Sequence, residues 1–228
     1  MIDKKKIRRS FNAHAASYDG SAHLQRRVAE ELAEQIGLLG IAPAAILDIG
    51  TGTGYIPLSM SRLFPKASLQ ACDLARGMLL VARDKSAGGH GRTPGFVNAD
   101  AEFLPYRSGS FDLVVSSLAY QWLANWLAAF REAARVLRAG GVFCFTTLGS
   151  GTLCELKDSY RRSHHARGNG ASPALHEFVR EEDLRDMLVN GGFGDVSVQG
   201  RLEREYHADV KQLLIGLKSI GAQNGSQN

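Results

Sequence analysis

An apolar run passes directly into a glycine-rich loop at Ile46-Leu47-Asp48-Ile49-Gly50-Thr51-Gly52-Thr53-Gly54. Glycine allows positive φ and a close approach of a ligand to the backbone, because it has no Cβ. Open α/β sheets bind ligands at such loops, between the carboxyl end of a strand and the start of a helix. Asp48 lies inside the apolar strand, where a carboxylate is costly unless it is used. The stretch therefore predicts a strand, a ligand-binding loop and a helix, against the alternative of a glycine-rich turn without a ligand.

Short apolar runs alternate with helical patterns on both sides of this loop. The predicted strands cover residues 44–49, 67–72, 95–98, 111–116, 142–147 and 195–201. The predicted helices cover residues 5–17, 22–39, 54–63, 75–86, 123–138, 152–163 and 181–190. Apolar strands bounded by helices imply βαβ units and a parallel sheet covered on both faces. Right-handed crossovers make a doubly wound sheet the default topology, so we predict an α/β, Rossmann-like fold with a mostly parallel sheet.

The composition is that of an ordinary globular chain. Of its 228 residues, 44% are hydrophobic and 22% charged, and this length fits one structural domain. No apolar run approaches the roughly 18–20 residues of a membrane span, and none follows the basic amino terminus as in a signal peptide. We therefore predict a cytoplasmic protein that does not enter a membrane. Cys72, Cys144 and Cys154 form no CxxC pair and no metal-ligand spacing, so reduced thiols and no metal site are expected.

Two further carboxylates follow predicted strands. Asp73 comes 23 residues after Gly50, where an acidic side chain accepts the hydroxyls of a ribose. Asp100 follows the next strand, where a carboxylate can accept the exocyclic amine of an adenine. Together with Asp48 they make three acidic residues without a phosphate-seeking cation. This pattern indicates a nucleoside ligand that itself carries positive charge.

The competing interpretation is a dinucleotide-binding loop. That fingerprint has the spacing G-x-G-x-x-G/A. Here the spacing is G-x-G-x-G, and Tyr55 occupies the position that the fingerprint needs small. An acidic residue just before the glycines also fits a pyrophosphate poorly.

In four blocks, which occur in the family's order, the chain resembles the class I S-adenosylmethionine-dependent methyltransferases. The blocks are Leu47-Asp48-Ile49-Gly50-Thr51-Gly52-Thr53-Gly54, Cys72-Asp73-Leu74 with Met78, Asn98-Ala99-Asp100-Ala101-Glu102, and Phe111-Asp112-Leu113-Val114. The resemblance implies S-adenosylmethionine as the cofactor, with Asp73 on the ribose hydroxyls and Asp100 on the adenine amine. It also implies that the loop glycines border the methionine moiety and that Leu74 and Met78 pack near the adenosine. The predicted cofactor-binding residues are Asp48, Gly50, Thr51, Gly52, Gly54, Asp73, Leu74, Met78, Asp100, Ala101, Glu102 and Ser117.

Segments outside these blocks resemble the malonyl-[acyl-carrier protein] O-methyltransferases of biotin synthesis. They are residues 11–26, Ser117-Leu118-Ala119-Tyr120-Gln121-Trp122, Phe145-Thr146-Thr147-Leu148 and Leu217-Lys218-Ser219-Ile220-Gly221-Ala222. That family methylates the free carboxylate of a malonyl thioester, so that fatty-acid enzymes will elongate the ester. The resemblance implies malonyl-acyl carrier protein, or malonyl-CoA, as substrate and partner. The chain has no target-base motif and no appended recognition domain, so no nucleic-acid partner is expected.

Methyl transfer to a carboxylate suits a chain without a catalytic triad. A carboxylate with a pKa near 4 is already ionised at neutral pH, so no general base is required. Orientation and desolvation of two oppositely charged reactants would then provide the acceleration. Tyr18 and Gln121 are the predicted catalytic residues, and Tyr120, Trp122 and Phe145 the predicted substrate-binding residues. For Tyr18 and Trp122 the alternative is a purely packing role.

The resemblance divides one structural domain into four parts. Residues 1–40 are expected to form an amino-terminal helical lid, 41–150 the S-adenosylmethionine-binding core, 151–220 the substrate-side helices and last strand, and 221–228 a disordered tail. Members of the family continue into a closing strand, and no remaining run supplies it here, so this strand is expected to be missing. The 195–201 strand would then pair with the 142–147 strand, lie at an exposed edge, or be completed by another chain, which leaves the oligomeric state open.

Two other functions remain compatible with the residues. One is a methyltransferase for another small molecule, such as a quinone precursor, and the other is a non-catalytic cofactor-binding accessory protein. The carrier protein of this family is acidic, and seven arginines could supply a docking face or could simply be solvated charges. They are Arg8, Arg9, Arg26, Arg27, Arg161, Arg162 and Arg167.

Overall fold

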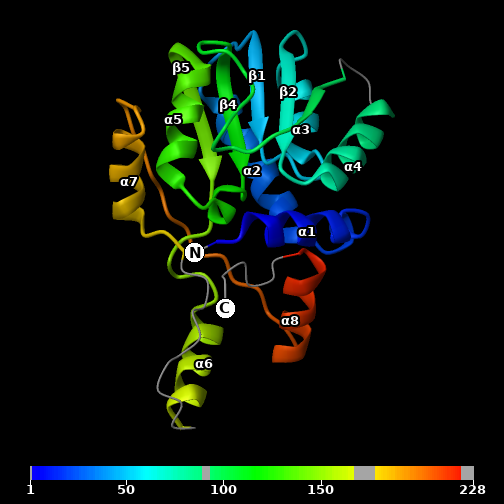
Figure 1. Cartoon of the computed structure of the whole chain (residues 1–228), viewed down its shortest axis with the longest axis vertical. Helices are drawn as coiled ribbons and strands as arrows, with labels where there is room; N and C mark the ends of the chain where they lie inside the picture. The colour runs from blue at the N-terminus through cyan, green and yellow to red at the C-terminus, as the bar shows by residue number, and fades with distance from the viewer. Residues whose placement is uncertain (1, 89–92, 167–177, 222–228) are drawn as a thin grey trace.

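A five-stranded parallel sheet forms the centre of the computed structural model, which describes residues 2–88, 93–166 and 178–221 (Figure 1). The strands are β1 (Ala45–Ile49), β2 (Ser68–Asp73), β3 (Gly95–Asn98), β4 (Phe111–Ser117) and β5 (Leu137–Thr146). Their order is β3-β2-β1-β4-β5, and every pair within these residues is parallel. The order reverses beside β1, so the loop after β1 lies at the topological switch point of the sheet.

Helices connect the strands and cover the sheet. They are α1 (Lys4–His14), α2 (His23–Leu38), α3 (Tyr55–Leu63), α4 (Arg76–Ala87), α5 (Trp126–Val136), α6 (Cys154–Ala166), α7 (Glu181–Asn190) and α8 (Val210–Ser219). Two 3₁₀ turns lie at Tyr18–Gly20 (η1) and Tyr120–Trp122 (η2). The α/β, doubly wound prediction is therefore confirmed.

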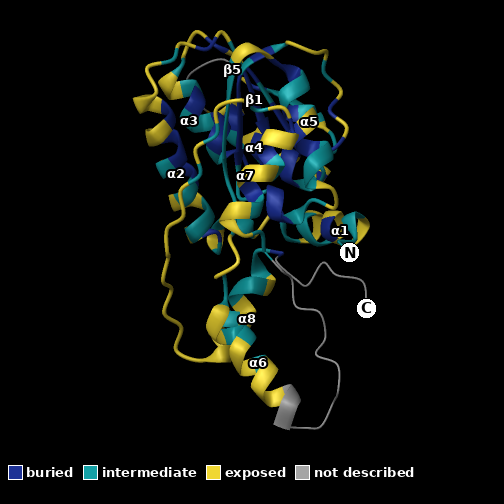
Figure 2. Ribbon diagram, turned by 90° about the vertical axis from the view of Figure 1, so that its left-hand side faces the viewer, coloured by how far each residue is buried: buried dark blue, intermediate teal, exposed yellow. Residues whose placement is uncertain are grey.

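The core consists of two apolar layers, one on each face of the sheet. Ile46 packs against α2 and α3, whereas the next residue, Leu47, packs against α5 and α7 (Figure 2). Both side chains are completely buried. Successive residues of a strand point to opposite faces, so a strand covered on both sides needs an unbroken apolar run. This is why the sequence shows no alternation around Asp48.

The amino-terminal helix α1 lies across the carboxyl ends of the strands rather than on a face of the sheet (Figure 1). Ile7 is the residue of α1 that is buried in the core. The Asn12 Oδ1 atom accepts a hydrogen bond from the Gly77 backbone N–H at 2.6 Å. Helix α2, by contrast, buries Leu32 and Ile36 against the sheet. Of the lid expected at residues 1–40, we therefore propose that residues 4–20, which comprise α1 and η1, act as the lid.

Helices α6 and α8 project beyond the carboxyl edge of the sheet (Figures 1 and 2). No described residue of α8 is buried. The stretch before α8 is fastened to α2 by ion pairs of Arg27 with Glu203, at 2.9 Å, and of Arg201 with Glu31. These contacts are polar and exposed, so they hold the segment weakly.

The prediction of a strand over residues 195–201 is wrong. This segment has no regular secondary structure and forms no ladder within the described residues. Val196 and Val198 still pack against the aromatic side of the core, and the Val196 carbonyl accepts a hydrogen bond from the Arg185 side chain at 2.7 Å. The two valines, two residues apart, therefore mark the side of this segment that faces the core. Strand pairing also requires the edge of a neighbouring strand within reach.

Helix α8 was not predicted, and some predicted helix ends differ from those observed. The helix predicted over residues 123–138 begins at Trp126, because the Asn125 side chain accepts a hydrogen bond from the Ala128 N–H and caps it. The polar, glycine-rich sequence of residues 164–175 predicts a loop, but residues 164–166 belong to the end of α6. Residues 167–175, with Arg167, and residues 222–228 of the tail expected at 221–228 lie outside the described residues. No helix in the described part of the chain is both long and apolar enough to cross a membrane.

Phe130 provides a test of the aromatic layer, because it is completely buried and contacts Tyr120, Phe143 and Phe145. The Phe130→Ala variant should lose about 3–5 kcal/mol of unfolding free energy, since it leaves a cavity. Urea unfolding followed by circular dichroism measures this loss. Leu38→Ala, at a side chain that is 79% exposed, is the control and should change the value by less than about 0.5 kcal/mol. Equal effects of the two variants would contradict the assigned layer.

Candidate active site

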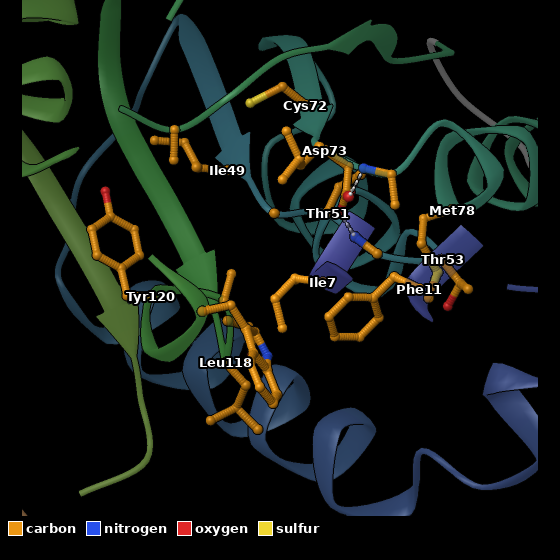
Figure 3. Close-up of a pocket in the computed structure, with 18 of the residues that line it drawn as sticks. Ile7, Phe11, Ile49, Thr51, Thr53, Cys72, Asp73, Met78, Leu118 and Tyr120 are labelled. Atoms are coloured by element: carbon orange, nitrogen blue, oxygen red, sulfur yellow. Dashed lines mark hydrogen bonds between the residues drawn. The ribbon is translucent and has the colours of Figure 1, made fainter. Parts of the chain in front are cut away.

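A cavity opens at the carboxyl ends of β1, β2 and β4, beneath α1 (Figure 3). Including the space at its open mouth, its volume is about 1080 Å³. The floor comes from the loop after β1 and from residues that follow β2, β3 and β4, and the roof comes from the lid. Ile7 and Phe11 of α1 lie opposite Asp73 and Thr51 in Figure 3. The cavity therefore lies where open α/β sheets bind ligands and is covered on one side by a separate element.

The three loop glycines all have positive φ, but each is required for a different reason. A Cβ on Gly50 would lie 2.3 Å from the Cβ of Ala119, and a Cβ on Gly54 would lie 3.0 Å from that of Ala82 in α4. A Cβ on Gly52 would meet no atom within 4 Å and would enter open space. Gly50 and Gly52 line the cavity, whereas Gly54 does not. Only Gly52 is therefore a position where the absence of a side chain leaves room for a ligand.

Asp73 lines the cavity and is held firmly by backbone donors. Its Oδ2 accepts a hydrogen bond from the Gly52 N–H at 2.8 Å, and its Oδ1 accepts one from the Ala75 N–H at 2.7 Å. Burial nevertheless raises the pKa of Asp73 to about 6, although both hydrogen bonds act in the opposite direction. The carboxylate thus joins the glycine loop to the start of α4 and retains lone pairs for a further donor.

Asp48 is buried completely beneath the glycine loop. Neither of its carboxylate oxygens accepts a hydrogen bond from the part of the chain that the structure describes. Burial raises the pKa of Asp48 to about 7; the nearby Thr51 hydroxyl opposes this rise, and the charge of Asp73 adds to it. Asp48 is therefore largely protonated in the ligand-free protein near neutral pH, and a nearby cation would favour its ionised form, whereas an anion would disfavour it.

Asp100 and Glu102 share one cation, Lys4. Asp100 Oδ2 lies 2.6 Å from Lys4 Nζ, and Asp100 Oδ1 accepts a hydrogen bond from the Glu102 N–H at 3.0 Å. Glu102 Oε2 lies 2.7 Å from the same Nζ, while its Oε1 accepts hydrogen bonds from the N–H groups of Ala124 and Asn125, both at 2.9 Å. Asp100 and Ala101 line the cavity, and Glu102 does not. Glu102 therefore fixes the start of α5 instead of facing the cavity.

Tyr18 lies in the wall of the cavity on the lid. Burial raises the pKa of its hydroxyl far above the ordinary range, and the negative charge of Asp73 adds to this shift. Tyr18 is therefore a hydrogen-bond donor and not a base at neutral pH. The next residue, Asp19, accepts a hydrogen bond from the Thr53 hydroxyl at 2.6 Å and pairs with Lys85 of α4, so the lid is attached directly to the glycine loop.

The predicted substrate-side residues divide into two groups. Tyr120 and Trp122 line the cavity, and Trp122 contacts Phe11 of the lid edge-to-face with ring centroids 5.7 Å apart. Phe145 is part of the aromatic layer and stacks on Phe143 at 4.8 Å. Gln121 points away from the cavity: its Nε2 donates to the Leu118 carbonyl at 2.6 Å, and its Oε1 accepts from the Thr147 hydroxyl at 3.3 Å.

Gln121 supports the cavity wall at a strained residue. Leu118 lines the cavity and has a φ of +47°, a conformation that is costly for leucine. The Gln121 amide holds its carbonyl, and the N–H of Leu118 donates to the Thr146 carbonyl at 3.0 Å. The remaining predicted residues Thr51, Leu74, Met78 and Ser117 all line the cavity.

Sequence reasoning expected a lid over residues 1–40 but named none of the α1 residues that line the cavity as site residues. Lys4, Ile7, Arg8 and Phe11 line it together. Their spacing of three, four and seven residues places them on one helical face, so the helical pattern of this segment carried the signal. The described residues contain no group of three or more His, Cys, Asp or Glu that could hold a metal ion.

Known proteins resemble this chain in sequence and in fold. Residues 47–145 match the family model of the methyltransferase domain. The chain is 43% identical to the malonyl-[acyl-carrier protein] O-methyltransferase of Geobacter sulfurreducens, over 99% of the chain and 84% of that relative. It is 38% identical to the protein of the same name from Laribacter hongkongensis, over 98% and 75%. Among solved structures, YcgJ of Bacillus subtilis has a similar fold, with a TM-score of 0.56 at 21% identity over 71% of the chain and 68% of that protein.

The raised pKa values predict how the stability of the ligand-free protein depends on pH. Because the folded state holds a proton on Asp48 up to about pH 7, and the unfolded state releases it near pH 4, unfolding free energy falls as pH rises through this window. Between pH 6 and 8 this carboxyl should account for a loss of about 1–2 kcal/mol. Asp48→Asn should abolish that part of the loss in urea unfolding at the two pH values.

Asp84→Asn is the matched control, because the Asp84 side chain is exposed on α4. It should retain the pH dependence of the unchanged protein. An Asp48→Asn variant with the same loss of stability between pH 6 and 8 as the unchanged protein would contradict a protonated Asp48.

Proposed function

The chain belongs to the malonyl-[acyl-carrier protein] O-methyltransferase family, and we propose from this premise that it methylates the free carboxylate of a malonyl thioester on acyl carrier protein. The methyl donor is S-adenosylmethionine, and the product is the methyl ester that enters biotin synthesis. The observation that carries the proposal is the cavity at one edge of the sheet beneath the lid, which Asp73 and Asp100 line while Asp48 lies buried behind the glycine loop. We keep the cytoplasm as the expected location.

The residues present fit a nucleoside with a positively charged group. Asp73 would accept the ribose hydroxyls, because its carboxylate is fixed by two backbone donors and faces the cavity. Asp100 would accept the adenine amine, and Leu74 and Met78 would pack against the adenosine. The open space at Gly52 would receive the methionine part, above the buried carboxylate of Asp48. Asp73 on the cavity wall and Asp48 buried behind it would favour a cation over an anionic dinucleotide at this end, whereas Asp100 is paired with Lys4.

Bound S-adenosylmethionine would supply an electrophilic methyl group on a positively charged sulfur, and the malonyl carboxylate oxygen would form the new bond as the carbon–sulfur bond breaks. The carboxylate needs no base because it is ionised at neutral pH. Tyr18, which stays protonated, would donate a hydrogen bond that orients the carboxylate. Phe11 and Trp122 would exclude water where the charges meet, and this would strengthen the attraction between the reactants.

Charge on the lid supports docking of an acidic carrier at the cavity mouth. Among the arginines considered from the sequence, Arg26, Arg27 and Arg161 form ion pairs with carboxylates of the chain itself. Arg8 lines the cavity, and its exposed neighbour Arg9 is also on α1. We therefore propose that the carrier approaches along α1 rather than along α2 or α6. An electrostatic approach of this kind weakens as salt rises.

Mass spectrometry of malonyl-acyl carrier protein after incubation with the protein and S-adenosylmethionine tests the activity. The expected result is a gain of one methylene in mass at the free carboxyl group, removed again by ester hydrolysis. Asp73→Ala should abolish the gain, and Asp84→Ala should not. Binding of S-adenosylmethionine without methylation of the malonyl thioester would instead indicate an accessory protein, and a methylated product that is not an ester would indicate a different methyltransferase.

Tyr18→Phe tests the proposed donor on the lid. Removal of one hydrogen bond to a charged reactant should lower kcat about 10–100-fold, while Kd for S-adenosylmethionine changes less than about twofold. Steady-state kinetics and calorimetry give the two values. Tyr206→Phe is the control, because that side chain is 91% exposed. Unchanged turnover in Tyr18→Phe would remove the hydroxyl from the mechanism.

A further inference from the structure

Lys4 connects the first turn of the lid to the proposed adenine end of the cavity. Its ammonium lies 2.6 Å from Asp100 Oδ2 and 2.7 Å from Glu102 Oε2. The side chains of Lys4 and Asp100 are about one quarter exposed, and that of Glu102 is only 7% exposed. We propose that Lys4 is a latch: it closes the lid over the bound nucleoside and limits how fast S-adenosyl compounds leave. This inference rests on the proposed function, because it takes Asp100 as the adenine contact.

The lid is fastened at both ends, and the two ends differ. At the far end, Asn12 accepts a hydrogen bond from the Gly77 N–H, and Asp19 binds the Thr53 hydroxyl and Lys85. These contacts hold the lid to the glycine loop and to α4. At the near end, Lys4 holds it to Asp100 and Glu102. Release of Lys4 alone would therefore open the adenine end of the cavity while the far end stays attached.

The position of Lys4 also couples the lid to the opposite wall. Glu102 receives Lys4 on Oε2 and the N–H groups of Ala124 and Asn125 on Oε1. These two residues directly follow the wall segment that contains Tyr120 and Trp122. One carboxylate thus links the lid, the adenine contact and the substrate wall. Closing the latch would order all three around the ligand.

Lys4 is charged throughout the physiological range. Partial burial alone would lower the pKa of Lys4, but hydrogen bonds to Asp100 and Glu102, with their charges, outweigh burial and raise the pKa above its ordinary value. The contact therefore acts as an ion pair. Because it is partly exposed, dissolved salt should weaken it. Dependence on salt separates this contact from the apolar contacts of Ile7 and Phe11, which salt does not screen.

Stopped-flow fluorescence of the full chain tests the latch, because Trp122 in the cavity wall reports occupancy. The measurement is the rate of dissociation of S-adenosylhomocysteine, the product that remains after methyl transfer, at low and high salt. In the unchanged protein the rate should rise with salt. Lys4→Gln should dissociate about tenfold faster at low salt and depend little on salt, as expected for loss of a charge-assisted contact. Lys4→Arg, which keeps the charge, should stay within about threefold of the unchanged protein.

Lys5→Gln is the matched control, because Lys5 is the exposed neighbour of Lys4. It should behave as the unchanged protein. The latch is overturned if Lys4→Gln does not accelerate dissociation of S-adenosylhomocysteine or if Lys5→Gln accelerates it equally. It is also overturned if the dissociation rate of the unchanged protein does not depend on salt concentration. The proposed function fails separately, if the unchanged protein neither binds S-adenosylmethionine nor methylates the malonyl thioester.

Discussion

Parallel strand pairing places buried carboxylates at one edge of the sheet, and the arrangement of the site depends on this constraint. The registers that pair Ile49 with Cys72 and Asp73 with Asn98 bring the loops after β1, β2 and β3 together. Asp48 and Asp73 then lose water, and the pKa of each rises. Burial of carboxylates costs stability in the ligand-free protein. A cationic nucleoside would offset that cost, so the same carboxylates that destabilise the free protein favour the ligand of a methyltransferase.

The proposed lid must also open, because a ligand has to enter and leave a closed cavity. A helix with a large apolar face would bind the sheet edge too firmly to release a ligand on each turnover. Helix α1 combines apolar contacts of Ile7 and Phe11 with polar contacts of Lys4, Asn12 and the adjoining Asp19. Polar contacts exchange readily with water, so they allow opening without exposing a large apolar surface. The polar contacts and the apolar contacts of α1 are therefore expected to contribute separately to closing the cavity.

Features encoded by neighbouring residues were predictable from the sequence, whereas features that depend on distant partners were not. Apolar runs gave the five strands, and the positions of Asp73 and Asp100 after two of them gave the acidic edge. Val196 and Val198 pack against the core, but the expected strand does not form, because a ladder needs a partner strand that these residues cannot supply. Lys4 lies 96 residues from Asp100, so no local pattern marked the contact. Helix α8 buries none of its described residues, so its sequence has only a weak apolar pattern and the helix was not predicted.

Different parts of the chain form the proposed cofactor side and the roof of the cavity, so similarity of fold alone does not determine the substrate. The methyltransferase-domain match covers residues 47–145 and includes Asp73 and Asp100, which line the cavity, and the buried Asp48. The roof comes from residues before that match, namely Lys4 to Tyr18. Similarity at 21% identity therefore supports the sheet, while the relatives at 43% and 38% identity extend over the roof as well. Selection of a malonyl carboxylate requires groups on the far side of the methyl group from the adenosine, and we propose that the lid and the Leu118–Trp122 wall, whose residues line the cavity, supply them.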